Sequence, residues 1–137
     1  MRLINALRRR SAMERRLLWE AMLVLARAAL AIRGRPFPQV VGFGAIPLAA
    51  RPARDIPPVL VTRSVRAVAR RMPFRALCFE QGLAVQRMLR RRGHDARLHY
   101  GIALGDGISA HVWVTLDDNI IHGGETAGAF REVGQWP

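Results

Sequence analysis

The sequence predicts an α+β protein in which N-terminal helices pack on a small antiparallel sheet. Up to Gly93 the apolar residues recur at helical spacing, and after Gly93 they alternate with a period of 2, as strand geometry requires. An order along the chain of helices first and then a meander of strands is typical of α+β proteins. The chain has 137 residues, half of them hydrophobic, and no internal repeat, so we expect one domain over residues 1–137.

The first expected helix covers residues 12–33. Its polar positions Arg16, Glu20 and Arg27 leave nearly all the remaining surface apolar, so we expect this helix to be largely buried. Its apolar part, residues 17–32, is shorter than a membrane span and contains two charges, which disfavours insertion into a bilayer. No small-residue cleavage pattern marks a signal peptide.

Gly34 and three prolines open a connection over residues 35–58. The apolar patch at residues 40–43 in this connection fits either a short turn of helix or a strand. A second amphipathic helix is expected over residues 59–72, where arginines alternate with apolar residues at helical spacing, and Pro73 ends it.

The strongest helix signal lies in PFRALCFEQGLAVQRMLRRRG, residues 73–93. Cys78, Gly82, Val85 and Leu89 fall on one stripe of this helix, which we expect to face the interior. Gly82 would permit the close approach of a neighbouring strand or helix. A triple arginine followed by glycine suits the C-terminal end.

Three strands are expected next. Residues 96–104 and 110–117 alternate in polarity, and the glycines of residues 105–107 make the turn between them. Asp118 and Asn119 suit a tight hairpin turn into a short returning strand at residues 120–122. The remaining tail carries few clear signals.

Composition narrows the partners and the compartment. With 22 Lys and Arg against 10 Asp and Glu, the net charge of +12 would attract nucleic acid, anionic lipid or an acidic partner. The arginine clusters contain no interleaved aromatics that would stack bases, so we expect no nucleic acid, and a solvated basic face explains them equally. A single cysteine points to a reducing compartment, the cytoplasm, and excludes a cysteine-based zinc cage. No nucleotide motif is present, and we expect no cofactor.

Cys78, at the start of its helix, is the candidate nucleophile. A helix N-terminus offers unpaired N–H groups and the positive end of the macrodipole, which stabilise a thiolate or an oxyanion. The backbone N–H of Cys78 would then contribute to an oxyanion hole. The alternative is that a lone cysteine on an apolar stripe is a small buried hydrophobe.

A thiol that attacks an amide needs a base and then an acid, and histidine supplies both near neutral pH. His94 follows a helix end and His99 lies in a strand without polar neighbours, whereas His111 opens a strand in the phrase SAHVWV. We therefore choose His111 as the partner of Cys78. Trp113 lies two residues on and shares its face, where it would shield the imidazole, line a substrate groove or pack in the core.

The joint pattern of PFRALCFEQGLAVQRMLRRRGHDARLHYGIAL and SAHVWVTLDDNIIHGG resembles the stand-alone B2 protein of lasso-peptide biosynthesis. This family consists of transglutaminase-like leader peptidases of the papain-like cysteine protease superfamily. The resemblance covers about residues 59–130, which would form the catalytic core, while residues 1–58 would form the N-terminal helix and connection. It implies a transglutaminase or papain-like core.

The resemblance also implies function and partners. The activity would be removal of the leader from a lasso precursor peptide, with Cys78 as nucleophile and His111 as general base and acid. A separate leader-recognition protein and the lasso cyclase would act with this chain. The open alternatives are another acyl-transfer activity on the same fold, amidase or transglutaminase, and a non-catalytic basic binding module.

The family also implies a third residue that orients the imidazole. Many relatives have Asp where this chain has Gly123. Asp117 is six residues from His111 on one strand, roughly 20 Å, which is too far. Hairpin pairing would bring Glu125 near the ring, although an exposed loop glutamate fits it equally; a backbone carbonyl, a water or a simple dyad also fits.

Overall fold

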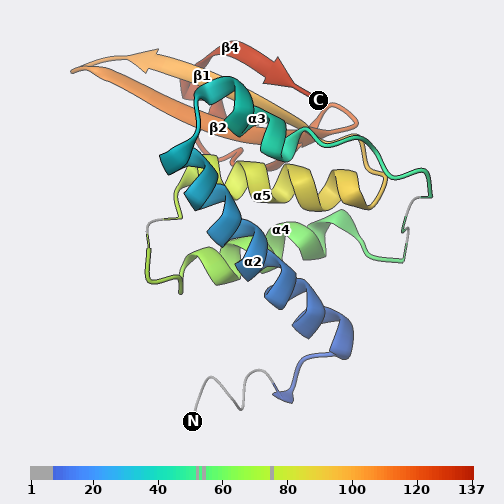
Figure 1. The fold of residues 1–137 in the computed structure, drawn as a ribbon. Helices are drawn as coiled ribbons and strands as arrows, with labels where there is room; N and C mark the ends of the chain where they lie inside the picture. Colours follow the sequence, from blue (N-terminus) through green and yellow to red (C-terminus); the bar gives the residue numbers. More distant parts are fainter. Residues whose placement is uncertain (1–7, 52, 54, 75) are drawn as a thin grey trace.

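The computed structural model, which describes residues 8–51, 53, 55–74 and 76–137, has the predicted α+β architecture (Figure 1). Arg75, in the loop before Cys78, lies outside the described residues. The elements follow in the order α2 (Ala12–Gly34), α3 (Phe37–Gly44), α4 (Pro58–Ala69), α5 (Cys78–Arg91), β1 (Arg97–Leu104), β2 (Ile108–Leu116), β3 (Asn119–His122), the 3₁₀ turn η1 (Ala127–Ala129) and β4 (Arg131–Trp136).

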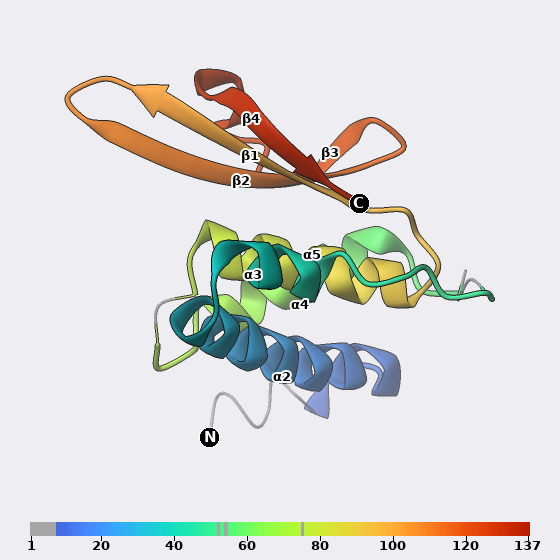
Figure 2. The same cartoon turned by 45° about the horizontal axis from the view of Figure 1, so that its top comes forward.

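The helices cover one face of an antiparallel sheet whose strand order is β3-β2-β1-β4 (Figure 2). Helix α5 is central, because it contacts α2, α3 and α4 as well as β1 and β2. The buried core accordingly joins apolar side chains of α2, α4 and α5 to those of β1 and β2. Helix α5 therefore lies between the sheet and α2 (Figure 2).

Helix α2 begins with a capping box, in which Ser11 accepts a hydrogen bond from the N–H of Glu14 and the Glu14 carboxylate accepts one from the N–H of Ser11. Leu17, Ala21 and Leu25 face the core and are almost fully buried, as expected. The prediction that α2 is largely buried is wrong for its other side, which exposes three large apolar side chains: Trp19, Leu23 and Leu30. No helix in the described part of the chain is long and apolar enough to cross a membrane.

The undecided segment at residues 40–43 is helical and belongs to α3, whose Val40 and Val41 are buried. Proline in the first turn suits this start, because its missing N–H has no partner at a helix N-terminus anyway. Helix α4 ends at Ala69, earlier than the expected Met72.

Three details of the sheet differ from the sequence prediction. Strand β2 begins at Ile108, before the expected Ala110, and the β2–β3 turn consists of Asp117 and Asp118 instead of Asp118 and Asn119. Both turn aspartates have positive φ, 51° and 63°, as a type I′ hairpin turn requires. Strand β4, which the sequence did not indicate, pairs with β1 and makes the sheet four-stranded.

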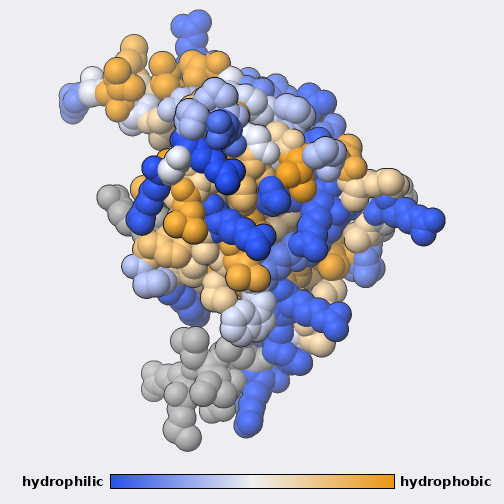
Figure 3. Space-filling model, in the orientation of Figure 1, coloured by the Kyte–Doolittle hydropathy of each residue, from blue (hydrophilic) through white to orange (hydrophobic). Residues whose placement is uncertain are grey.

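The β1–β2 hairpin extends beyond the helices (Figure 1), and its tip is apolar. Leu104 and Ile108 pair across the hairpin there, and each is 79% exposed. The space-filling view shows apolar side chains near this tip and a mixture of apolar and hydrophilic side chains over the rest of the same face (Figure 3).

Candidate active site

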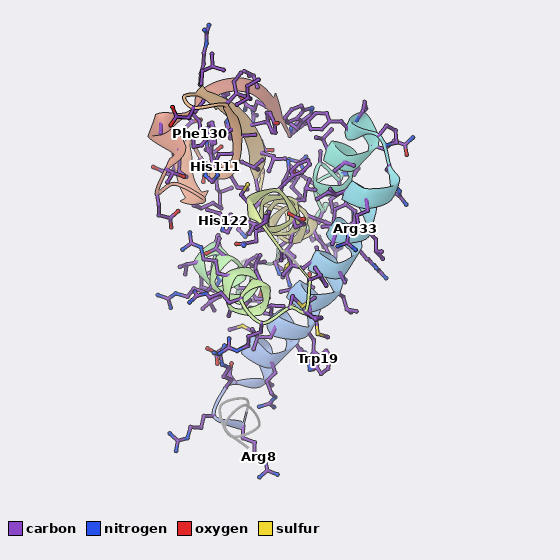
Figure 4. All side chains as sticks on the ribbon, turned by 90° about the vertical axis from the view of Figure 1, so that its left-hand side faces the viewer. Arg8, Trp19, Arg33, His111, His122 and Phe130 are labelled. Carbon is purple, nitrogen blue, oxygen red and sulfur yellow. The ribbon has the colours of Figure 1, made fainter. Side chains whose placement is uncertain are left out.

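A cleft of about 390 Å³ lies where α4, the start of α5 and the edge of the sheet meet. Strand β3 pairs with residues 114–116 of β2 only. The edge of β2 at His111 therefore has no pairing with β3 and borders the cleft. Figure 4 shows His111 and His122 on the side of the molecule opposite Arg33 of α2. The described residues that line the cleft are Arg66, Arg70, Cys78, Gln81, His111, Val112, His122, Gly123 and Glu125.

Helix α5 presents Cys78 in its first turn, and the thiol is partly exposed. The N-cap residue Leu77 has no side-chain hydrogen-bond acceptor, so the first N–H groups of the helix are not capped by it. The Glu80 carboxylate instead accepts a hydrogen bond from the Leu77 N–H at 3.2 Å. The helix terminus therefore retains donors for an anion beside the sulfur.

At Gly82, one turn after Cys78, helix α5 packs closely against side chains of the sheet. A Cβ at this position would lie 2.7 Å from Val112 Cγ1 and 3.0 Å from Leu98 Cδ1. Since Val112 follows His111, this contact fixes the start of α5 next to the strand that carries the histidine. The packing role expected for Gly82 is confirmed.

The His111 imidazole is held by a backbone group. Its Nε2 lies 2.7 Å from the carbonyl oxygen of Gly123. A carbonyl only accepts hydrogen bonds, so Nε2 carries the proton and donates it. In the neutral ring Nδ1 is then unprotonated and can accept the proton of a thiol.

Aromatic rings fix the plane of the same imidazole. His111 packs against Trp113 at a centroid distance of 6.2 Å and against Phe130 at 5.2 Å. Trp113 in turn stacks on His99, with centroids 5.6 Å apart and planes 6° apart. Trp113 is 7% exposed, so it buttresses and shields the imidazole as part of the packed sheet and does not line the cleft.

Gly123 occupies the position where many of the resembling proteins have Asp, and its backbone explains the difference. Its φ is +76°, and a Cβ there would lie 2.7 Å from the carbonyl oxygen of Val112. Glycine lets the chain pass this close to β2, which brings its own carbonyl to His111. Of the open alternatives for orienting His111, the structure therefore supports the backbone carbonyl.

The two acidic candidates lie elsewhere. The Glu125 carboxylate lines the cleft but pairs with Arg66 at 3.2 Å, and its side chain is 71% exposed. A hydrogen bond from its own N–H and the positive charge of Arg66 lower the pKa of Glu125. Asp117 lies in the β2–β3 turn, away from the cleft, as the distance along the strand predicted.

His122, at the end of β3, is a second histidine of the cleft. It is 4% exposed, and its Nδ1 has no hydrogen-bond partner among the described residues. Burial lowers the pKa of His122 to about 4, and the nearby Arg66 contributes in the same direction. The ring is therefore neutral at physiological pH and keeps a polar nitrogen without a protein partner.

The sequence did not identify the contributions of Arg66, Arg70, Gln81 and His122 to the cleft. The two arginines are spaced i, i+4 on α4, and this spacing indicates that they share one polar face of the helix. It does not indicate which part of the molecule this face contacts. His122 ends the expected returning strand. The sequence therefore indicated which strand lies beside His122, but it did not indicate that the side chain is buried. No group of three or more His, Cys, Asp or Glu in the described ranges is arranged to hold a metal ion.

The chain was compared with models of known protein families. The model of the transglutaminase-like superfamily matches residues 21–135, from α2 to β4. No curated protein matches the chain. No solved structure matches it either.

Proposed function

Because the chain belongs to the transglutaminase-like superfamily, whose members are generally cysteine-based enzymes, we propose that it is a cysteine peptidase. Its substrate in this proposal is the precursor of a lasso peptide, from which it removes the leader. The observation that carries the proposal is that Cys78, in the first turn of α5, and His111, oriented by the Gly123 carbonyl, line the same cleft. The sequence pattern shared with lasso B2 proteins supports the choice of substrate.

The chemistry follows from these positions. Nδ1 of His111 accepts the proton of the Cys78 thiol, and the sulfur attacks the carbonyl carbon of the scissile peptide bond. N–H groups at the start of α5 stabilise the oxyanion. The protonated imidazole then donates its proton to the leaving amine as the C–N bond breaks. Water, deprotonated by His111, hydrolyses the thioester and regenerates the thiol.

The proposal includes partners and place of action. Following the resemblance to lasso B2 proteins, we assign leader recognition to a separate protein and ring closure to a lasso cyclase that takes over the freed core peptide. A reduced Cys78 is required, so we place the reaction in the cytoplasm.

The test is cleavage of a lasso precursor by the purified protein, with and without the recognition protein, followed by mass spectrometry. We expect two peptides whose masses add up to the precursor plus water. Cys78→Ala and His111→Ala should each lower the rate by a factor of at least about 10³. His94→Ala, which removes an imidazole outside the cleft, is the matched control.

Two outcomes would contradict the proposal. Full cleavage by Cys78→Ala would show that Cys78 is not the nucleophile. A product that carries an amide or isopeptide adduct instead of two free peptides would indicate acyl transfer, the other chemistry of a thioester intermediate.

A further inference from the structure

One wall of the cleft is basic and comes from α4. Arg66 and Arg70 lie one helical turn apart, so they project from the same face of the helix, and both line the cleft that contains Cys78 and His111. Arg66 is partly exposed and Arg70 is exposed. Their guanidinium groups are thus accessible to a molecule that enters the cleft.

The charge of this wall is only partly neutralised. Among the described lining residues Glu125 supplies the single carboxylate, and it pairs with Arg66. Among the residues that the structure describes, no carboxylate lies within ion-pair distance of Arg70. The cleft therefore carries a net positive charge while both histidines are neutral.

A second observation in the same cleft also indicates a polar ligand. His122 is almost fully buried, yet its Nδ1 has no partner among the described residues. A buried polar nitrogen that no protein group satisfies is costly unless a ligand or water satisfies it. Burial is the main cause of the lowered pKa of His122, and the positive charge of Arg66 acts in the same direction.

We propose that Arg66 and Arg70 form a subsite for a carboxylate of the peptide substrate, next to the bond that Cys78 attacks. The position of this subsite relative to the scissile bond rests on the proposed peptidase function. Guanidinium groups bind carboxylates through two parallel hydrogen bonds, which fixes both position and orientation. The carboxylate is that of an Asp or Glu side chain or of a peptide C-terminus.

Glu125 acts as the internal occupant of this subsite. Its ion pair with Arg66 is exposed, and exposed ion pairs contribute little net stabilisation. A substrate carboxylate can therefore replace Glu125 at Arg66 while Arg70 provides the second positive charge. The exchange releases a side chain that the rest of the fold does not hold.

The first test uses the single cysteine of the chain and requires no peptidase activity. Cys78 is alkylated with iodoacetate, which is negative, and with iodoacetamide, which is neutral, and the ratio of the two rates is measured. Each reagent loses iodide to the sulfur, so a change in thiolate content alters both rates and cancels in the ratio. We expect the Arg66→Gln/Arg70→Gln double variant to lower this ratio by about threefold to tenfold at low salt.

Matched variants make the outcome specific. Arg63→Gln removes one positive charge from an exposed position of α4 outside the cleft, against two in the double variant, and should leave the ratio nearly unchanged. Glu125→Gln removes the internal occupant and should raise the ratio. The advantage of iodoacetate should also shrink as salt is added. An equal ratio in wild type and in the folded double variant overturns the subsite.

The second test identifies the source of the carboxylate. Cys78→Ala protein is titrated with precursor-derived peptides that differ by Asp or Asn near the cleavage site, and with the same peptides ending in a free carboxylate or an amide. We expect one carboxylate to tighten binding about tenfold, and the double variant to abolish the difference. If no peptide is cleaved by the wild type but the alkylation ratio behaves as expected, the subsite stands and the peptidase proposal fails. Cleavage without any carboxylate preference, together with an unchanged ratio, overturns the subsite alone.

Discussion

The two ends of α5 differ in how they are held. At the C-terminal end Arg90 is buried and donates hydrogen bonds to the Ile46 carbonyl at 2.6 Å and to Asp95 at 2.7 Å. Arg92 donates to Glu20 of α2 at 2.9 Å. At the N-terminal end the cap residue offers no side-chain acceptor, and Cys78 is partly exposed to a cleft.

The contacts that hold α5 in the fold thus lie at its C-terminal end, whereas the residue proposed to carry the chemistry lies at its N-terminal end. The C-terminal end anchors α5 to α2 and to the loops on both sides, so the helix does not depend on its first turn for its place in the fold. The first turn can then keep donors without protein partners, and the cleft can keep a buried histidine whose burial costs free energy. The following predictions test this division, from the largest expected effect to the smallest.

His122 should make stability depend on pH. Its pKa is about 4 in the folded protein and near 6.5 in the unfolded chain, so the unfolded chain binds more protons between these values. The free energy of unfolding should therefore fall by roughly 3 kcal/mol as the pH drops from 7 to 4. Urea unfolding across this range measures it. His122→Asn should flatten the curve, and an unchanged slope in that variant would falsify the assignment.

Arg90→Leu should destabilise the C-terminal anchor. The change leaves the Ile46 carbonyl without its donor and the half-exposed Asp95 carboxylate with only the longer bond from Arg97 at 3.4 Å, which should cost about 2 to 3 kcal/mol in urea unfolding. Arg91→Leu is the matched control, because its side chain is 70% exposed, and it should cost less than about 1 kcal/mol. Equal losses in both variants would show that the anchor is not specific to Arg90. The alkylation rate of Cys78 in the folded Arg90→Leu protein should stay near that of wild type.

Gly123→Asp should fail to create a better triad. The new Cβ would meet the Val112 carbonyl at 2.7 Å, and aspartate at positive φ adds strain, so we expect a loss of about 2 kcal/mol together with slower peptide cleavage. Gly123→Ala separates the effect of the Cβ from that of the carboxylate. Faster cleavage by Gly123→Asp than by wild type would contradict the role assigned to the backbone carbonyl.

Gly82→Ala should have the smallest effect on stability and a larger one on activity. The added methyl meets Val112 at 2.7 Å, but alanine favours the helix, so the net loss should be about 1 kcal/mol. The clash moves the start of α5 away from β2, so peptide cleavage should slow by more than this loss explains. Adding Val112→Ala, which makes room for the methyl, should restore part of the rate; no recovery would mean that the contact does not position Cys78.

The sequence predicted α2, α4, α5 and the first three strands because their periods are explicit, and it left the short α3 undecided. Apolar positions of α2 and α5 recur at helical spacing, and β1 alternates in polarity. Strand β4 was missed because its residues 131–136 show no clean alternation, and its place is decided by pairing with β1, a contact between distant residues.

The same limit applies to the site. Cys78 and His111 were selected from local context, and the cleft does contain both. The group that orients His111 could not be read from side chains, because it is a backbone carbonyl delivered by the positive φ of Gly123. The basic wall depends on which face of α4 turns towards the cleft, and this follows from tertiary packing.

The Gly123 carbonyl has a consequence for how protons move during the reaction. A carbonyl offers the imidazole a dipole, whereas the aspartate of the resembling proteins offers a full negative charge. The carbonyl also takes up no proton from Nε2, so the proton that Nδ1 receives from the thiol can leave only towards the leaving amine of the substrate. In the proposed reaction every proton therefore moves through the Nδ1 side of the ring, and acylation should show a solvent deuterium isotope effect.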